Sequence, residues 1–151
     1  MTLKEEIELV DNYIYILNVR FSGKINFTKH IDEKYLKIHT PSMILQPIVE
    51  NSVNYGISNI EWKGLIELSV YEKSDKVCIS IKDNGIGMSQ ELIKEVMNNK
   101  LKSADLSQDS NGVGLDNVMA RLHLFYEYED IFCIISEGKN KGTEVLICIP
   151  L

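Results

Sequence analysis

Two short glycine-spaced segments, at residues 83–88 and 111–117, constrain most strongly what this chain can fold into. The first, Asp-Asn-Gly-Ile-Gly-Met, directly follows a run with the apolar–polar alternation of a β-strand. The second, Asn-Gly-Val-Gly-Leu-Asp-Asn, opens a run with helical periodicity. Glycines at this spacing let a backbone bend tightly and approach a ligand that a side chain would keep away. Together with Glu50-Asn51 upstream, the two segments predict one nucleotide site assembled from three separated stretches.

The composition limits the class of partner. The chain has 151 residues, which suits a single domain with its own core, and its net charge is −6 with a pI of about 5.1. An acidic chain is a poor binder of nucleic acid or anionic membranes, because both need a basic face. No apolar run is long enough to span a bilayer and no charged-then-apolar leader is visible, so we expect a soluble chain that is not exported.

Cysteine and histidine do not predict a metal site. Cys78, Cys133 and Cys148 each lie in an aliphatic run, and no two of them have metal-ligand spacing. We therefore expect buried, reduced thiols in strands. The three histidines are scattered and none is paired with another histidine or a cysteine at ligand spacing.

Residues 3–21 predict a helix with a narrow apolar seam. The seam positions are spaced four and three apart in alternation, and they are Leu3, Ile7, Val10, Ile14, Leu17 and Phe21. Such a seam fits a helix that packs on its own domain, and it equally fits a dimer seam or the end of one. The sequence leaves both open, because about three heptads is the minimum for predicting a coiled coil.

The remaining pattern predicts further helices and antiparallel hairpins. A helix is expected to begin with Thr40 as its cap and Pro41 at its first position, and to run to Gly56 with some distortion at Pro47. Strands are expected at residues 25–31 (an edge strand), 65–71, 77–82, 131–136 and 143–149, helices at 91–97 and 112–125, and a polar loop at 98–111. This order predicts an α/β fold, a two-layer sandwich of one mixed, largely antiparallel sheet with helices on one face.

Glu50 and Asn51 are candidate groups for metal and phosphate chemistry. A carboxylate and an amide carbonyl suit magnesium, which prefers oxygen ligands and shares its shell with substrate phosphates. The carboxylate could also polarise an attacking hydroxyl or imidazole. The alternative is a polar stripe that simply faces solvent.

Asp83 is a candidate for reading a base. Placed at the end of a strand, a buried carboxylate can accept a hydrogen bond from the exocyclic amino group of adenine, where guanine offers a carbonyl. Gly85 and Gly87 would then let the loop lie against the base. The alternative is a plain turn, because Asp-Asn-Gly is also strong turn chemistry.

Gly112 and Gly114 open the helix expected at 112–125. The start of a helix presents free N–H groups and a partial positive charge to phosphates, and the polar loop before it could close over them. The alternative is a pair of glycines that merely end a loop. A dinucleotide-binding fold is rejected, because residues 85–87 lack the third glycine and no chain of parallel βαβ units follows.

These motifs, taken in order, resemble the ATP-binding catalytic domain of bacterial sensor histidine kinases. Residues 45–51 (Leu-Gln-Pro-Ile-Val-Glu-Asn) look like the asparagine-box helix of the LytS/YesM-like branch. Residues 83–88 and 112–122 resemble the two glycine boxes, and residues 142–145 (Gly-Thr-Glu-Val) resemble the closing glycine-threonine motif. Residues 15–21 look like the segment that joins the dimerisation helices to this domain. The resemblance covers nearly the whole chain and implies a Bergerat-type ATP-binding fold.

The resemblance also implies roles for individual residues. Asn51 would hold magnesium that bridges the phosphates, Glu50 would assist phosphoryl transfer, and Asp83 would read adenine. The glycines of both boxes would shape the pocket and the hinges of a lid, and Thr143 would support the Asp83 side. The residues expected to contact ATP are Asn51, Asn54, Tyr55, Asp83, Gly85, Gly87, Met88, Gly112, Val113, Gly114, Leu115 and Thr143.

Two positions depart from the family pattern. Asn54 stands where a lysine or arginine that touches phosphates is common, so we expect Lys100 or Lys102 to take over that charge. Pro47 stands where the gyrase-type ATPases have their catalytic acid, which argues against a self-sufficient ATPase.

The phosphoacceptor histidine of this branch is not found in the sequence. The resemblance therefore implies a fragment in which residues 1–22 end a dimerisation or linker helix and residues 23–151 form the catalytic domain. The parent protein would be a homodimeric, membrane-anchored sensor with its kinase part in the cytoplasm, and a response regulator as partner. Two other functions stay open: an anti-sigma-factor-type serine kinase, and a non-catalytic module that senses nucleotides.

Overall fold

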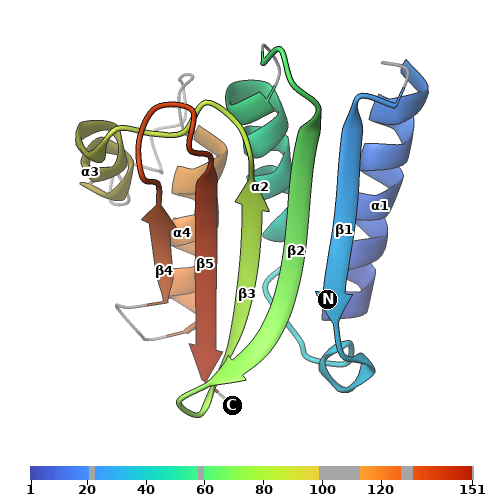
Figure 1. Cartoon of the computed structure of the whole chain (residues 1–151). Helices are drawn as coiled ribbons and strands as arrows, with labels where there is room; N and C mark the ends of the chain where they lie inside the picture. Colours follow the sequence, from blue (N-terminus) through green and yellow to red (C-terminus); the bar gives the residue numbers. More distant parts are fainter. Residues whose placement is uncertain (21–22, 58–59, 99–112, 127–130, 151) are drawn as a thin grey trace.

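The computed structural model describes residues 1–20, 23–57, 60–98, 113–126 and 131–150. Its centre is one five-stranded sheet with the strand order β1-β2-β3-β5-β4 (Figure 1). The strands are β1 (Ile25–Ile31), β2 (Gly64–Lys73), β3 (Lys76–Asp83), β4 (Phe132–Ile135) and β5 (Thr143–Pro150). Only the β1–β2 pair is parallel among these strands, and β1 lies at an edge, so the predicted mixed sheet and its predicted edge strand are confirmed.

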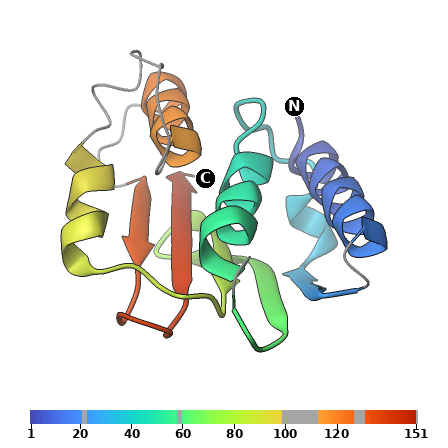
Figure 2. The same ribbon diagram turned by 90° about the horizontal axis from the view of Figure 1, so that it is seen from above.

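The helices lie on one face of this sheet. They are α1 (Leu3–Arg20), α2 (Leu45–Asn51), the π-helix η2 (Ser52–Ile57), α3 (Gln90–Asn98) and α4 (Val113–Phe125), with a short 3₁₀ turn η1 (Glu33–Tyr35). Seen from above, α1, α2 and α4 form a layer against the sheet, and α3 lies beyond β4 (Figure 2). Alternate residues of β2 (Ile66, Leu68 and Val70) are buried beneath the helices, as the period of a half-covered strand requires. The predicted two-layer sandwich is therefore confirmed.

The apolar seam of α1 packs on the chain's own core. Leu3, Val10 and Ile14 are buried at 5% exposure or less, and Leu17 packs against the same cluster. Burial inside the chain leaves these seam residues unavailable to a second helix. Of the two interpretations that the sequence left open, the structure supports packing within the domain. Phe21 lies outside the described residues. The predicted domain boundary between residues 22 and 23 stays a prediction.

The predicted start of the second helix is wrong. The helix begins at Leu45, not at Thr40, and the side-chain oxygen of Thr40 has no hydrogen-bond partner. Met43 has a φ of 59°, which no helical residue adopts, and this breaks any helix that would start earlier. The later start places Pro47 in the first turn, where its missing N–H is not needed, so the expected distortion has no cause there.

Two smaller predictions agree with the structure. The turn between β2 and β3 has positive φ at Ser74 and Asp75, the geometry of a tight hairpin turn. The cysteines lie on three neighbouring strands and are free thiols, which agrees in strand position and redox state. The predicted burial holds for Cys78 only, because Cys133 and Cys148 are partly exposed. Within the described ranges, no helix has the length and apolarity needed to cross a membrane.

Candidate functional site

Asp83 ends β3 in the middle of the sheet and points into a cavity. It lies opposite Thr143 of β5, and its Oδ1 accepts a hydrogen bond of 2.8 Å from the N–H of Gly85. Burial raises the pKa of the Asp83 carboxyl above its ordinary value, and hydrogen bonds from Gly85, the Ser52 hydroxyl and the Thr143 backbone partly oppose that rise. A half-buried carboxylate held by these hydrogen bonds is a hydrogen-bond acceptor with a fixed direction.

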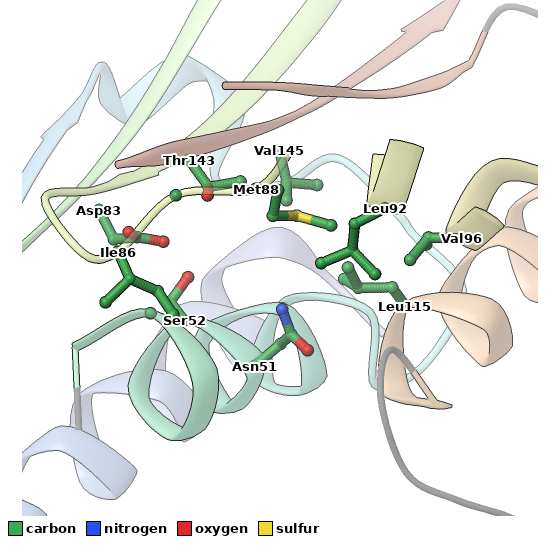
Figure 3. Close-up of a pocket in the computed structure, with 12 residues that line it drawn as sticks. Asn51, Ser52, Asp83, Ile86, Met88, Leu92, Val96, Leu115, Thr143 and Val145 are labelled. Carbon is green, nitrogen blue, oxygen red and sulfur yellow. The ribbon is translucent and has the colours of Figure 1, made fainter. Parts of the chain in front are cut away.

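The helix that faces Asp83 changes its winding at the site. Asn51 is the last residue of α2, and Ser52 opens the π-helix η2. Ser52 is 5% exposed and bonds to Asp83, whereas Asn51 lies on the side of the cavity toward Leu115 (Figure 3). Single π turns occur frequently at functional sites, because they re-aim side chains along a helix. Two neighbouring polar residues thus serve different parts of one cavity.

The cavity between these elements has a volume of about 240 Å³ and is mostly apolar. Its lining consists of Asn51, Ser52, Gly56, Asp83, Ile86, Gly87, Met88, Leu92, Val96, Leu115, Thr143 and Val145. Asp83 is the one ionisable side chain in this lining, and no lysine or arginine belongs to it among the described residues. An apolar cavity with one directed acceptor suits a flat, hydrogen-bond-donating ring such as adenine.

The loop after Asp83 is threaded between two other backbones. A β-carbon on Gly85 would lie 2.1 Å from the carbonyl oxygen of Gly56, and one on Gly87 would lie 2.1 Å from that of Gly138. Gly87 also has a φ of 78°, which residues with a side chain rarely adopt. Because these two glycines have no side chain, the carbonyl groups of Gly56 and Gly138 can pack directly against the loop. This packing fixes the loop, which forms one wall of the cavity.

Ser136 ties this loop to the turn between β4 and β5. Its hydroxyl donates to the carbonyl of Gly142 at 2.6 Å and accepts from the N–H of Met88 at 3.0 Å. The side chain is buried at 7% exposure. Ser136 could not be predicted from the sequence, because no local pattern links residue 88 to residue 136. The two come together because β3, which precedes Met88, and β4, which precedes Ser136, both pair with β5.

The structure brings half of the predicted contact residues into the cavity lining. These are Asn51, Asp83, Gly87, Met88, Leu115 and Thr143, and Gly85 supports the same loop. The lining residues that the sequence analysis missed are Ser52, Gly56, Ile86, Leu92, Val96 and Val145. Ser52 carried a usable signal, because it is a hydroxyl that directly follows Asn51 in the sequence.

Two predicted residues lie elsewhere. The Glu50 carboxylate accepts a hydrogen bond of 3.3 Å from Gln46. The pKa of the Tyr13 phenol on α1 is raised mainly by burial and also by the negative charge of Glu50. Asn54 is exposed and lines a second cavity between η2, α1 and β1. Neither belongs to the lining around Asp83, so any role in chemistry has to be exercised from outside it.

The other predicted contacts fall partly outside the described structure. The backbone of Tyr55 belongs to η2, and Val113 and Gly114 form the first turn of α4. Gly112, Lys100 and Lys102 lie outside the described residues, and so does the polar loop that was expected to cover the phosphates. The roles assigned to them stay predictions.

A family model, curated relatives and solved structures agree on the class of protein to which this chain is similar. Residues 37–151 match the family described as histidine kinase-, DNA gyrase B-, and HSP90-like ATPase. Sensor histidine kinase YesM of Bacillus subtilis is 29% identical over 99% of this chain, and sensor protein LytS of Oceanobacillus iheyensis is 32% identical over 98% of it. The catalytic domain of histidine kinase ThkA superposes with a TM-score of 0.64, covering 99% of this chain and 94% of that one at 18% identity.

The fold, the cavity and these matches define an ATPase-type catalytic domain. The chain belongs to the family of histidine kinase-, DNA gyrase B- and HSP90-like ATPases. Within that family it corresponds to the catalytic domain of sensor histidine kinases, so a serine kinase or a non-catalytic sensing module is not favoured. The chain spans about a quarter of the length of the two curated relatives, at 24% and 25%.

Proposed function

We propose that this chain binds ATP with the adenine ring in the cavity at the end of β3. The observation that carries the proposal is the half-buried carboxylate of Asp83, oriented by three hydrogen bonds in a cavity lined mostly by apolar side chains. The exocyclic amino group of adenine would donate to it. Guanine would place a carbonyl oxygen against the same carboxylate, and two acceptors facing each other repel.

The phosphate end of the nucleotide would lie toward Asn51. Its amide oxygen is the one protein ligand that we assign to magnesium, and the remaining ligands would come from phosphate oxygens and water. This fits the ion, which is usually held by few protein groups. Consistently, the described residues contain no group of three or more His, Cys, Asp or Glu side chains that could hold a metal on their own. Bound magnesium would neutralise charge on the phosphates.

The reaction would be transfer of the γ-phosphoryl group to a histidine on a dimerisation domain outside this chain. Glu50, which lies outside the cavity lining, would assist by orienting that histidine. We assign residues 1–22 to the end of a linker helix and residues 23–151 to the catalytic domain. The parent protein would be a homodimeric, membrane-anchored sensor that passes the phosphoryl group to a response regulator.

Calorimetric titration of the chain with ATP, with and without magnesium, tests this function. Wild-type protein is expected to bind ATP more tightly with magnesium, and Asn51→Ala is expected to lose that gain. Incubation with labelled ATP alone is expected to leave the chain unlabelled, because the acceptor histidine lies on another domain. No ATP binding, or an unchanged magnesium effect in Asn51→Ala, contradicts the proposed site. An acid-labile, base-stable phosphoprotein contradicts the assignment of the acceptor.

A further inference from the structure

A buried carboxylate on α1 holds the start of the helix that carries Asn51. Glu6 is 1% exposed, and its Oε2 accepts a hydrogen bond of 2.7 Å from the N–H of Met43. Its Oε1 accepts from the N–H groups of Ile44 and Leu45 at 3.0 and 2.9 Å. N–H groups at the start of a helix have no partner within the helix, and a negative charge is favoured there. Glu6 therefore acts as a cap supplied by a different helix.

The segment before α2 has no local means of holding this geometry. Ile44, at the cap position, makes no side-chain cap hydrogen bond, and Met43 has the strained φ of 59°. Such a conformation persists only where the surroundings impose it. Glu6 imposes it from α1, and Arg121 of α4 imposes it from the other side by donating to the Met43 carbonyl at 2.6 Å.

The helix transmits this constraint to the cavity. α2 runs without interruption from Leu45 to Asn51, so a shift at its start is carried to its end, because a hydrogen-bonded helix moves as a unit. Asp83, in contrast, ends a central strand, and the backbones of Gly85 and Thr143 hold its carboxylate in addition to Ser52 of η2. The position of Asn51 relative to Asp83 thus depends on where α1 holds Leu45.

We infer that Glu6 is a positioning residue for Asn51, through which α1 is coupled to the metal and phosphate end of the nucleotide cavity. The inference rests on the proposed function. Moving or loosening α1 shifts Asn51 and disturbs the adenine end less, because only Ser52, among the three groups that hold Asp83, belongs to the same helical stretch. This gives α1 a means of regulating how productively ATP–magnesium is held.

The test uses two substitutions at Glu6 and a matched control in the whole chain. Glu6→Gln keeps one acceptor oxygen but sets an amide NH₂ group against a backbone N–H, and Glu6→Ala removes every acceptor. Glu8→Gln makes the same change of charge on the exposed side of the same helix. The measured quantity is the ratio of the ATP dissociation constants without and with magnesium. Adenosine, which lacks phosphates, is titrated in parallel, and circular dichroism establishes that each variant is folded.

The ratio is expected to fall about tenfold in Glu6→Ala and about threefold in Glu6→Gln, because an ångström of misplacement at a catalytic site is costly. The adenosine dissociation constant is expected to change less than about twofold, since Asp83 keeps its place at the end of β3 and its hydrogen bonds from Gly85 and Thr143, and the Ser52 hydroxyl is still present. A merely structural role would weaken adenosine and ATP together. Glu8→Gln is expected to match wild type in every titration.

An unchanged ratio in folded Glu6 variants overturns the inference and leaves the proposed function intact. Equal weakening of adenosine and ATP overturns it as well. If Glu6→Ala does not fold, Glu6→Gln decides alone by the same criteria. If wild type and Glu8→Gln fail to bind ATP, the proposed function and the inference fall together.

Discussion

The two ends of the nucleotide cavity are built by different means. At the adenine end, Asp83 lies in the centre of the sheet, and its carboxylate is held by Ser52 and by the backbones of Gly85 and Thr143. At the other end, Asn51 terminates a seven-residue helix whose start is held by a carboxylate from α1. Under the proposed function, the sheet would give the base a fixed reader, whereas the phosphates would meet a group whose placement depends on a neighbouring helix. Base recognition and regulation would then depend on different parts of one small site.

The largest expected effect tests whether the adenine end is rigid by construction. Gly87→Ala should lower the free energy of unfolding by about 3 kcal/mol, because a β-carbon adds backbone strain and overlaps the Gly138 carbonyl. Gly23→Ala is the matched control: Gly23 has a similar φ of 70°, but a β-carbon there meets nothing within 4 Å. It should lose about 1 kcal/mol. Denaturant unfolding measures both, and equal losses would show that the close approach at Gly87 carries no cost.

Asp83→Asn tests the base reader itself. Replacing a charged acceptor by an amide should weaken ATP binding by about 2 kcal/mol, or about thirtyfold, because the amide can present a donor to the adenine amino group. Asp75→Asn removes the same charge in the turn between β2 and β3, at a φ of 64° that asparagine tolerates. Titration with ATP should leave this control at the wild-type affinity; similar losses in the two variants would point to net charge as the cause.

How much of this the sequence predicts depends on whether the determining contacts are local. Alternating residues located the strands, and Asp83 followed from its place at the end of one of them. The start of α2 was missed because Glu6, which caps it, lies 38 residues earlier than Ile44. Ser136 was missed for the same reason, since its partner Met88 lies 48 residues before it. The π-helix was missed because no residue type marks that winding.

Ser52→Ala sharpens the comparison, because Ser52 links the helix to the base reader. Loss of its hydroxyl should weaken ATP binding by about 1 kcal/mol and raise the pKa of Asp83 further. Ser80→Ala is a control on the same strand as Asp83: Ser80 is also buried and also bonds to a carboxylate, that of Glu144, but lies outside the cavity lining. Calorimetry should show unchanged ATP affinity for it. An unaffected Ser52→Ala would mean that the helix does not support the base reader.

An effect of pH is expected as well. Because the pKa of Asp83 is raised in the folded protein, its ionised form is disfavoured there, and its contribution to stability is lost as pH rises from the ordinary aspartate pKa through the raised one. Adenosine binding needs the ionised form of Asp83, so the affinity for adenosine should fall as pH falls, whereas the stability contribution rises. The affinity should weaken about tenfold for each pH unit below the raised pKa. Comparing wild type with Asp83→Asn in melting and titration series isolates both trends. Parallel trends in the two proteins would assign the pH dependence to other groups.

The most direct test of the central claim is a titration of the whole chain with ATP and with GTP in the presence of magnesium. If Asp83 reads the exocyclic amino group of adenine, ATP should bind at least about thirtyfold more tightly than GTP, since the carboxylate would face a carbonyl in guanine. Equal affinities for the two nucleotides, or no binding of ATP, would contradict the account.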